Sequence, residues 1–279
     1  MSGLLGAAEI REIATRLGVR PTKKLGQNFV VDSNTCRKIV KSAGVGPDDV
    51  ALEIGPGLGS LTLAMLESAR EVIAIEIDER LALELPATAA RHGFDNSKLQ
   101  VICQDAMATS TLPLDPTVLV ANLPYNVSVP VLLRFLELFP TLRSGVVMVQ
   151  SEVADRLVAK PGSKTYGSPS VKAAWWADLT AAGTVSRSIF WPVPNVDSSL
   201  VRFVRHENPG DEQLRRATFK VIDFAFAQRR KMMRAALSEL CGGSSQASAI
   251  LEASGIDPTI RGEGLELSNF IKIAITLSK

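Results

Sequence analysis

Residues 50–62 read VALEIGPGLGSLT, a short apolar run followed at once by three alternating glycines. The run has the length and composition of a strand buried on both faces, and the residues after Gly59 suit a helix. Gly55, Gly57 and Gly59 then lie in a strand-to-helix turn, where glycine permits positive φ and lets a ligand approach without meeting a Cβ atom. We therefore expect a nucleotide-like ligand at this turn.

The turn departs from the dinucleotide-binding fingerprint G-x-G-x-x-G. A third glycine would stand at residue 60 in that fingerprint, where this chain has Ser60, and Glu53 before the turn is no part of it. The pattern E-x-G-x-G-x-G instead resembles the first motif of methyltransferases that use S-adenosylmethionine. A glycine turn kept only for tight packing is the competing interpretation.

Two acidic residues follow the next two expected strands. Glu76 stands at the end of the run 71–77, and Asp105 follows the run 99–103. The carboxyl ends of consecutive parallel strands meet at one edge of a sheet, which is where open α/β sheets bind ligands. Glu76 can accept hydrogen bonds from ribose hydroxyls there, and Asp105 can accept one from an adenine amino group.

The rest of the chain alternates short apolar runs with helical stretches as far as residue 150. This alternation predicts a parallel sheet covered on both faces. Two later runs, 178–185 and 199–206, have no helix between them and should form an antiparallel pair at the edge of the sheet. The expected strands of the parallel part are 50–54, 71–77, 99–103, 117–122 and 145–150.

The strand pattern ends at His206, and ENPGDEQ after it reads as a linker. Helices are expected at 211–227, 231–240, 246–253 and 267–277. The fold class is therefore α/β, a Rossmann-like, mostly parallel sheet of the class I methyltransferase type with an antiparallel edge strand, followed by a small all-α domain. We expect domains at 1–206 and 207–279.

Composition and termini indicate a cytoplasmic protein. Of the 279 residues 46% are hydrophobic and the net charge is +2, while no apolar run is long enough to cross a bilayer. The three cysteines are isolated, which suits a reducing compartment. Near the N-terminus Ile10, Ile13, Ala14 and Leu17 form a helical stripe with acids nearby, which favours a docked helix over a targeting peptide.

Residues 118–128, VLVANLPYNVS, end the fourth strand on an unusual group of side chains. An adenine amino nitrogen is a poor nucleophile until acceptors hold its hydrogens. The Asn122 amide oxygen and the Leu123 carbonyl, fixed in direction by Pro124, can supply two acceptors, and Tyr125 can stack on an extruded base. We expect these four residues to be catalytic, although a strand end with a turn is the alternative.

This chemistry needs neither a strong base nor a metal. The only histidines are His92 and His206, in separate contexts, and no metal cluster or nucleophile triad is visible in the sequence. Basic clusters do suggest a phosphate-rich partner: Lys23 and Lys24, and Arg229, Arg230 and Lys231. A solvated helix face explains each cluster equally well.

The chain resembles the ribosomal RNA adenine dimethyltransferases, most closely the bacterial branch that acts on the small subunit. The resemblance runs from about residue 20 to the C-terminus. It rests on KKLGQNF (23–29), LEIGPGLGSLT (52–62), NLPYNVS (122–128), MVQSEVADRL (148–157), YGSPSV (166–171), FWPVPNVDSS (190–199), AQRRK (227–231) and RGEGLELSNF (261–270).

The resemblance implies S-adenosylmethionine as methyl donor and no metal. The implied cofactor contacts are Asn28, Val30, Gly55, Gly57, Glu76, Asp105 and Asn122. The implied substrate is a pair of adjacent adenosines in a hairpin loop near the 3′ end of small-subunit (16S) ribosomal RNA, each methylated twice within an immature 30S-type particle. A monomer is expected, with its helical domain against the ribosome.

Phe190 matches a family aromatic that faces the target base, but a plain packing role is equally compatible with the sequence. The chain also departs from the family at Pro169, at Asn195 and in RRKMMRAA (229–236), outside the proposed chemistry. Two other functions remain open. One is a large-subunit RNA methylase of the antibiotic-resistance type, and the other is a non-catalytic RNA-binding assembly or transcription factor on the same fold.

Overall fold

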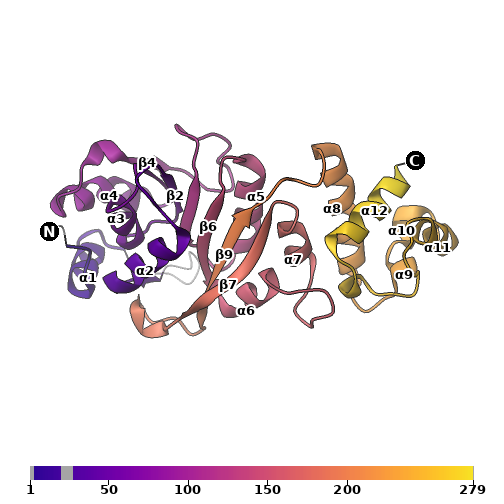
Figure 1. Ribbon diagram of the computed structural model, residues 1–279. Helices are drawn as coiled ribbons and strands as arrows, with labels where there is room; N and C mark the ends of the chain where they lie inside the picture. Colours follow the sequence, from indigo (N-terminus) through magenta and orange to yellow (C-terminus); the bar gives the residue numbers. More distant parts are fainter. Residues whose placement is uncertain (1–2, 20–27, 279) are drawn as a thin grey trace. The chain divides into compact units, whose positions relative to one another are not determined.

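The computed structural model describes residues 3–19 and 28–278 (Figure 1). These divide into two compact units, Met1–Ala154 with Thr180–Arg205 and Asp155–Leu179 with His206–Lys279. The boundary expected between residues 206 and 207 lies beside the last junction of these units, and the second unit also includes residues 155–179. That residues 207–279 form a separate domain stays a prediction.

The first unit is built on a seven-stranded sheet in the order β4-β3-β2-β5-β6-β9-β7. The pairs β2 with β3, β2 with β5, β3 with β4 and β5 with β6 are parallel, whereas β9 runs antiparallel to β6. The expected mostly parallel sheet with an antiparallel edge is therefore confirmed. The strands are β2 (Val50–Ile54), β3 (Glu71–Glu76), β4 (Leu99–Cys103), β5 (Val118–Asn122), β6 (Ser144–Gln150), β7 (Ala177–Val185) and β9 (Ser198–Arg205).

Helices cover this sheet, and every residue of β2 is buried. The helix α4 packs on β3 and β4, while α2 packs on α3, β5 and β6. A central strand covered on both faces is mostly apolar, which is why the sequence shows a nearly continuous apolar run there, interrupted by Glu53. The helices of this part are α2 (Ser33–Ala43), α3 (Ser60–Leu66), α4 (Glu79–Arg91) and α5 (Ser128–Leu138), with 3₁₀ turns η2 (Asn96–Lys98) and η3 (Arg187–Ile189). The helix α6 (Ser151–Leu157) begins in the first unit and ends in the second.

The N-terminal helix α1 (Ala7–Arg16) docks by the stripe that the sequence shows. Ile10, Ile13 and Ala14 are buried in the core of the first unit. Arg16 pairs with Glu84 of α4 at 2.6 Å, which fixes the helix against that element. The docked helix expected at the N-terminus is confirmed.

A second, two-stranded sheet joins β1 (Phe29–Val30) to β8 (Phe190–Trp191) in antiparallel register. Strands this short leave no periodic pattern in the sequence, so neither was expected. Their pairing brings residues 29–30 against the proline-rich loop of the same unit.

The second unit is helical around a core of Val221, Ile222, Phe270 and Ile273. The single helix expected at 231–240 is wrong: Met232 is extended and pairs with Arg261 in an isolated bridge, so the first helix begins at Met233, and Leu237 separates it from a second short helix. The helices are α7 (Ser168–Ala173), α8 (Glu212–Ala227), α9 (Met233–Ala236), α10 (Ser238–Cys241), α11 (Ser244–Ala253) and α12 (Leu267–Leu277), with η4 at Gly262–Gly264.

No helix among the described residues combines the length and apolar character that crossing a lipid bilayer requires.

Candidate active site

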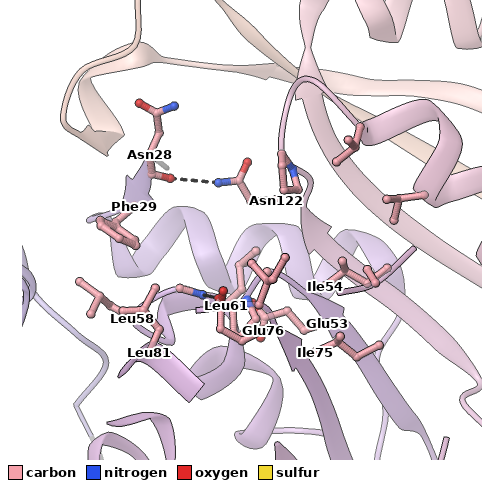
Figure 2. Close-up of a pocket in the computed structure, with 18 of the residues that line it drawn as sticks. Asn28, Phe29, Glu53, Ile54, Leu58, Leu61, Ile75, Glu76, Leu81 and Asn122 are labelled. Atoms are coloured by element: carbon pink, nitrogen blue, oxygen red, sulfur yellow. Dashed lines mark hydrogen bonds between the residues drawn. The ribbon is translucent and has the colours of Figure 1, made fainter. Parts of the chain in front are cut away.

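A cavity of about 270 Å³ opens at the carboxyl ends of β2, β3, β4 and β5 in the first unit (Figure 2). The sequence predicts a ligand at this edge of the sheet. The residues lining the cavity include those after all four strands and those of β1: Asn28, Phe29, Val30, Glu53, Gly55, Gly57, Ser60, Glu76, Asp105, Met107, Asn122, Pro124 and Val131.

The glycine turn has the backbone that its sequence suggests. Gly55, Gly57 and Gly59 have φ values of +72°, +58° and +100°. A Cβ atom on Gly57 would stand 2.9 Å from the Phe29 ring, and one on Gly59 would stand 2.6 Å from Leu85 Cδ1. Both conformation and space therefore require glycine, and the bare backbone forms one wall of the cavity.

Glu76 is fixed beside this turn. Its carboxylate accepts hydrogen bonds from the backbone N–H of Gly57 and of Asp78, each at 3.0 Å. Burial raises the pKa of Glu76, and the two backbone donors oppose that rise. A rigid acceptor so close to a glycine turn suits vicinal hydroxyls of a ribose.

Asp105 stands at the rim of the cavity. Its side chain is exposed, and Oδ1 accepts from the Met107 N–H at 2.8 Å. This bond holds the carboxylate in a tight turn directly after β4. The other carboxylate oxygen can accept from a ligand.

Asn122 is oriented by a contact that the sequence does not reveal. Its Nδ2 donates to the Asn28 carbonyl oxygen at 3.1 Å, as Figure 2 shows. Because that bond engages the nitrogen, it assigns Oδ1 as the end of the amide that can accept from a substrate amino group. The bond thus ties Asn28, just before β1, to Asn122 at the end of β5.

The remaining motif residues have different surroundings. Pro124 lines the cavity with Asn122, whereas the Leu123 side chain is buried and its N–H donates to the Met148 carbonyl at 3.0 Å. The hydroxyl of half-buried Tyr125 lies 2.8 Å from Ser198 Oγ. Burial raises the pKa of Tyr125, so its phenol stays protonated.

Several site residues have roles that sequence reasoning missed. Ser60, where a dinucleotide fingerprint has glycine, donates its hydroxyl to the Val30 carbonyl at 2.6 Å and so anchors β1 over the turn. Glu53 lines the cavity, is fully buried and accepts from the Thr62 hydroxyl. Burial raises the Glu53 pKa to about 8. The acid at the start of E-x-G-x-G was the one signal available for it.

The residues expected to contact nucleic acid have different surroundings. Lys23 and Lys24 lie outside the described residues. Phe190 is 2% exposed and packs in the core of the first unit, as the alternative packing role requires. Arg230 and Lys231 are exposed in the second unit.

Arg229 differs from its two neighbours. It pairs with Glu263 at 3.0 Å and donates to the Ser163 carbonyl at 3.4 Å, both within the second unit. Those contacts show that Arg229 stabilises the second unit, whether or not it also contacts phosphate.

Within residues 3–19 and 28–278, no three His, Cys, Asp or Glu side chains gather as a metal site would require. Independence from metals stays a prediction.

The sequence of this chain is similar to those of a known enzyme family. Residues 19–279 match the sequence profile of the family described as ribosomal RNA adenine dimethylase. Ribosomal RNA small subunit methyltransferase A of Leifsonia xyli subsp. xyli is 58% identical over 97% of this chain and 98% of its own length. The protein of the same name from Streptomyces griseus is 57% identical, over 97% of this chain and 94% of its own length.

Solved structures agree with the fold. A dimethyladenosine transferase from Plasmodium falciparum superposes with a TM-score of 0.74 and 26% identity, covering 88% of this chain and 95% of that one. The 23S rRNA methyltransferase ErmE gives a TM-score of 0.68 at 24% identity, covering 90% of this chain and all of its own. The second likeness is informative about fold alone.

Proposed function

The chain belongs to the ribosomal RNA adenine dimethylase family, and from this premise we propose that it dimethylates N6 of two adjacent adenosines in 16S ribosomal RNA. It is an rRNA small-subunit methyltransferase with a Rossmann-like fold. The observation that carries the adenine chemistry is the Asn122 amide, whose nitrogen is held by the Asn28 carbonyl so that its oxygen is presented as an acceptor.

The cavity suits S-adenosylmethionine as the methyl donor. Gly55 and Gly57 give a backbone wall without Cβ atoms, Glu76 offers a fixed acceptor to ribose hydroxyls, and Asp105 offers one to the adenine amino group. Asn28, just before β1, and Val30, on β1, line the same cavity. When bound, the donor supplies an electrophilic methyl group on a positively charged sulfur.

The residues of the chain then prepare the acceptor nitrogen. The Asn122 oxygen and the Leu123 carbonyl accept the two N6 hydrogens, which favours a pyramidal nitrogen with its lone pair available for attack. Tyr125 holds the extruded base by stacking, worth about 1 to 3 kcal/mol. Holding the two reactants in line can contribute about 7 to 11 kcal/mol to lowering the barrier.

This arrangement needs no strong general base. The nitrogen is cationic directly after methyl transfer, is then a strong acid, and releases its proton to water. The site residues therefore act by positioning the adenine amino group, and none of them has to abstract a proton from it.

Finer features of the function are proposals of the same kind. We propose that the substrate is an immature 30S-type particle, that the enzyme acts there as a cytoplasmic monomer without a metal, and that the helical second unit contacts the ribosome. Methylation would then be coupled to rRNA processing and small-subunit biogenesis.

The large-subunit alternative is tested by substrate choice. The 58% relative carries a small-subunit name, whereas the large-subunit enzyme ErmE is 24% identical. Purified small and large ribosomal subunits should be incubated separately with the enzyme and donor labelled in the methyl group. We expect label at the two adenosines of the small-subunit RNA; label confined to the large subunit would refute the assignment.

The non-catalytic alternative is tested at Asn122. We expect Asn122→Ala to lower kcat by about 10² or more, as loss of one transition-state contact does elsewhere, while RNA affinity largely survives. The exposed Asn96, in η2, gives the control Asn96→Ala, which should leave kcat unchanged. Equal activity of Asn122→Ala and wild type would place the chemistry elsewhere.

A further inference from the structure

Arg134 joins the helix that follows the target motif to the turn that carries Asp105. Its Nη2 atom donates to the Thr109 carbonyl oxygen at 3.1 Å. We propose that Arg134 is a positioning residue that holds the Asp105 turn in place and thereby sets the affinity of the site for the adenine amino group of the donor. This inference rests on the function proposed for Asp105.

Hydrogen bonds within the turn join Asp105 to a buried threonine. The Asp105 carbonyl accepts from the N–H of Ala108 at 2.9 Å and from the N–H and hydroxyl of Thr109, both at 3.1 Å. Thr109 is fully buried, whereas the Asp105 carboxylate is exposed at the cavity rim. The position of Thr109 therefore determines where the carboxylate stands.

The turn lies in a segment without regular secondary structure. Residues 104–117 contain neither helix nor strand. The segment is tied at its start by Gln104, whose N–H donates to the Glu76 carbonyl at 2.9 Å, and the Arg134 bond ties it again at Thr109. The two anchors lie on either side of Asp105, so each limits its movement.

Arg134 approaches from α5, which begins at Ser128 directly after the N-L-P-Y motif. Val131, one turn before Arg134, lines the cavity. The same helix therefore forms part of the cavity wall and reaches the turn opposite. Through it, the target side and the adenine side of the site share one rigid support.

The surroundings of the Arg134 Nε atom indicate that stability alone does not account for the residue, which is itself half-buried. The Arg134 Nε atom is buried and has no hydrogen-bond partner among the described residues. Leaving a buried donor unsatisfied is unfavourable, and few buried polar groups in folded proteins lack a hydrogen-bond partner. The bond from Nη2 to the Thr109 carbonyl supports a positioning role for Arg134 at the Asp105 turn.

The test compares two ligands of the folded enzyme by calorimetry. One is S-adenosylhomocysteine, and the other is its analogue with hydrogen in place of the N6 amino group. We expect Arg134→Met to weaken the first about tenfold and to leave the second nearly unchanged, because only the first uses the positioned carboxylate. A merely structural role would weaken both ligands equally, and that outcome, or no weakening at all, would overturn the proposal.

Two further variants separate the possible failures. Asp105→Asn should weaken S-adenosylhomocysteine selectively by itself; if it does not, the function proposed for Asp105 fails. If Asp105→Asn behaves as expected and Arg134→Met does not, the positioning role alone fails. Arg37→Met on α2, which breaks an exposed pair with Glu67 at the end of α3, is the matched control and should leave both affinities unchanged.

Should Arg134→Met not fold, Arg134→Lys provides the same test. Lysine keeps the charge but lacks the planar fork that reaches a carbonyl in a fixed direction. It must show the same selective loss to a smaller degree, and equal affinities of wild type and Arg134→Lys for both ligands would contradict the role.

Discussion

The Tyr125 side chain is fixed in position by a hydrogen bond of its hydroxyl. That hydroxyl bonds to Ser198, a fully buried residue of β9. Tyr125→Phe and Ser198→Ala should each raise the KM for RNA about fivefold, the effect of one hydrogen bond, with kcat nearly unchanged. Because both variants remove the same bond, the double variant should be no worse than either single one.

Steady-state kinetics on the RNA substrate measure this double-mutant cycle. Ser199→Ala is the matched control, since the neighbouring Ser199 bonds instead to Ser151 at 2.8 Å. Additive losses in the double variant would show that Ser198 does not act through Tyr125.

Glu53 gives the protein a pH-dependent stability. Burial raises its pKa from 4.5 to about 8, so the folded chain keeps a proton that the unfolded chain loses. The contribution is fully present below about pH 4.5, falls as pH rises and is lost above about pH 8. Glu53→Gln should therefore be more stable relative to wild type at about pH 9 than at about pH 5.

Urea denaturation at these two pH values gives the two free energies of unfolding. The Glu76 pKa is raised as well, so the wild type carries a second contribution of the same sign, and only the difference between the two proteins isolates Glu53. A difference that does not change with pH would mean that Glu53 is ionised in the folded protein.

At the level of elements, the glycine turn and β1 fit together closely. Gly57 has φ +58°, and a Cβ atom added there would stand 2.9 Å from the Phe29 ring, whereas Gly93, after α4, has φ +78° and open space around it. Both alanine variants incur the left-handed backbone cost of about 1 to 2 kcal/mol. Only Gly57→Ala must also displace β1, so it should weaken S-adenosylhomocysteine at least about tenfold.

Calorimetric affinities and melting temperatures of the two variants separate these effects. Gly93→Ala should lower the melting temperature and keep the affinity of wild type. If both variants bind the ligand normally, the contact between Phe29 and the turn has no part in forming the cavity.

The large elements could be predicted from the sequence because burial leaves a pattern. Strands such as β2 and β6 are apolar almost throughout, since both of their faces are covered, and they were predicted to within one residue. β1 and β8 were not predicted, because each has two residues and exists only through the other. The start of α9 was expected too early, since the bridge from Met232 to Arg261 is equally invisible in a local window.

The candidate site likewise contains features that the sequence predicts and features that it does not. Gly55, Gly57, Glu76 and Asp105 could be placed at one sheet edge because each follows a predictable strand. The bond from Asn122 to the Asn28 carbonyl joins residues 94 positions apart, and every residue has a carbonyl. Contacts of that kind, which orient side chains in the cavity, are visible only in the folded chain.

For the molecule as a whole, the cavity and the exposed basic stretch lie in different units. The first contains the whole cavity, and the second carries the basic stretch 229–231. Arg229 is engaged by Glu263 within its unit, so its loss should affect stability more than RNA affinity. Arg230 and Lys231 are exposed and are the sharper probes of a phosphate contact.

Reversing both exposed charges, Arg230→Glu with Lys231→Glu, should weaken RNA binding and reduce the slope of log affinity against log salt by about 1 to 2. Filter binding over a range of salt concentrations measures the slope. The control is Arg216→Glu with Lys220→Glu, which makes the same change in net charge on exposed residues of α8. If the control flattens the slope equally, the effect belongs to net charge; if neither does, residues 230 and 231 are a solvated surface. A slope that changes only at 230 and 231 would identify them as the place where the second unit meets RNA phosphates.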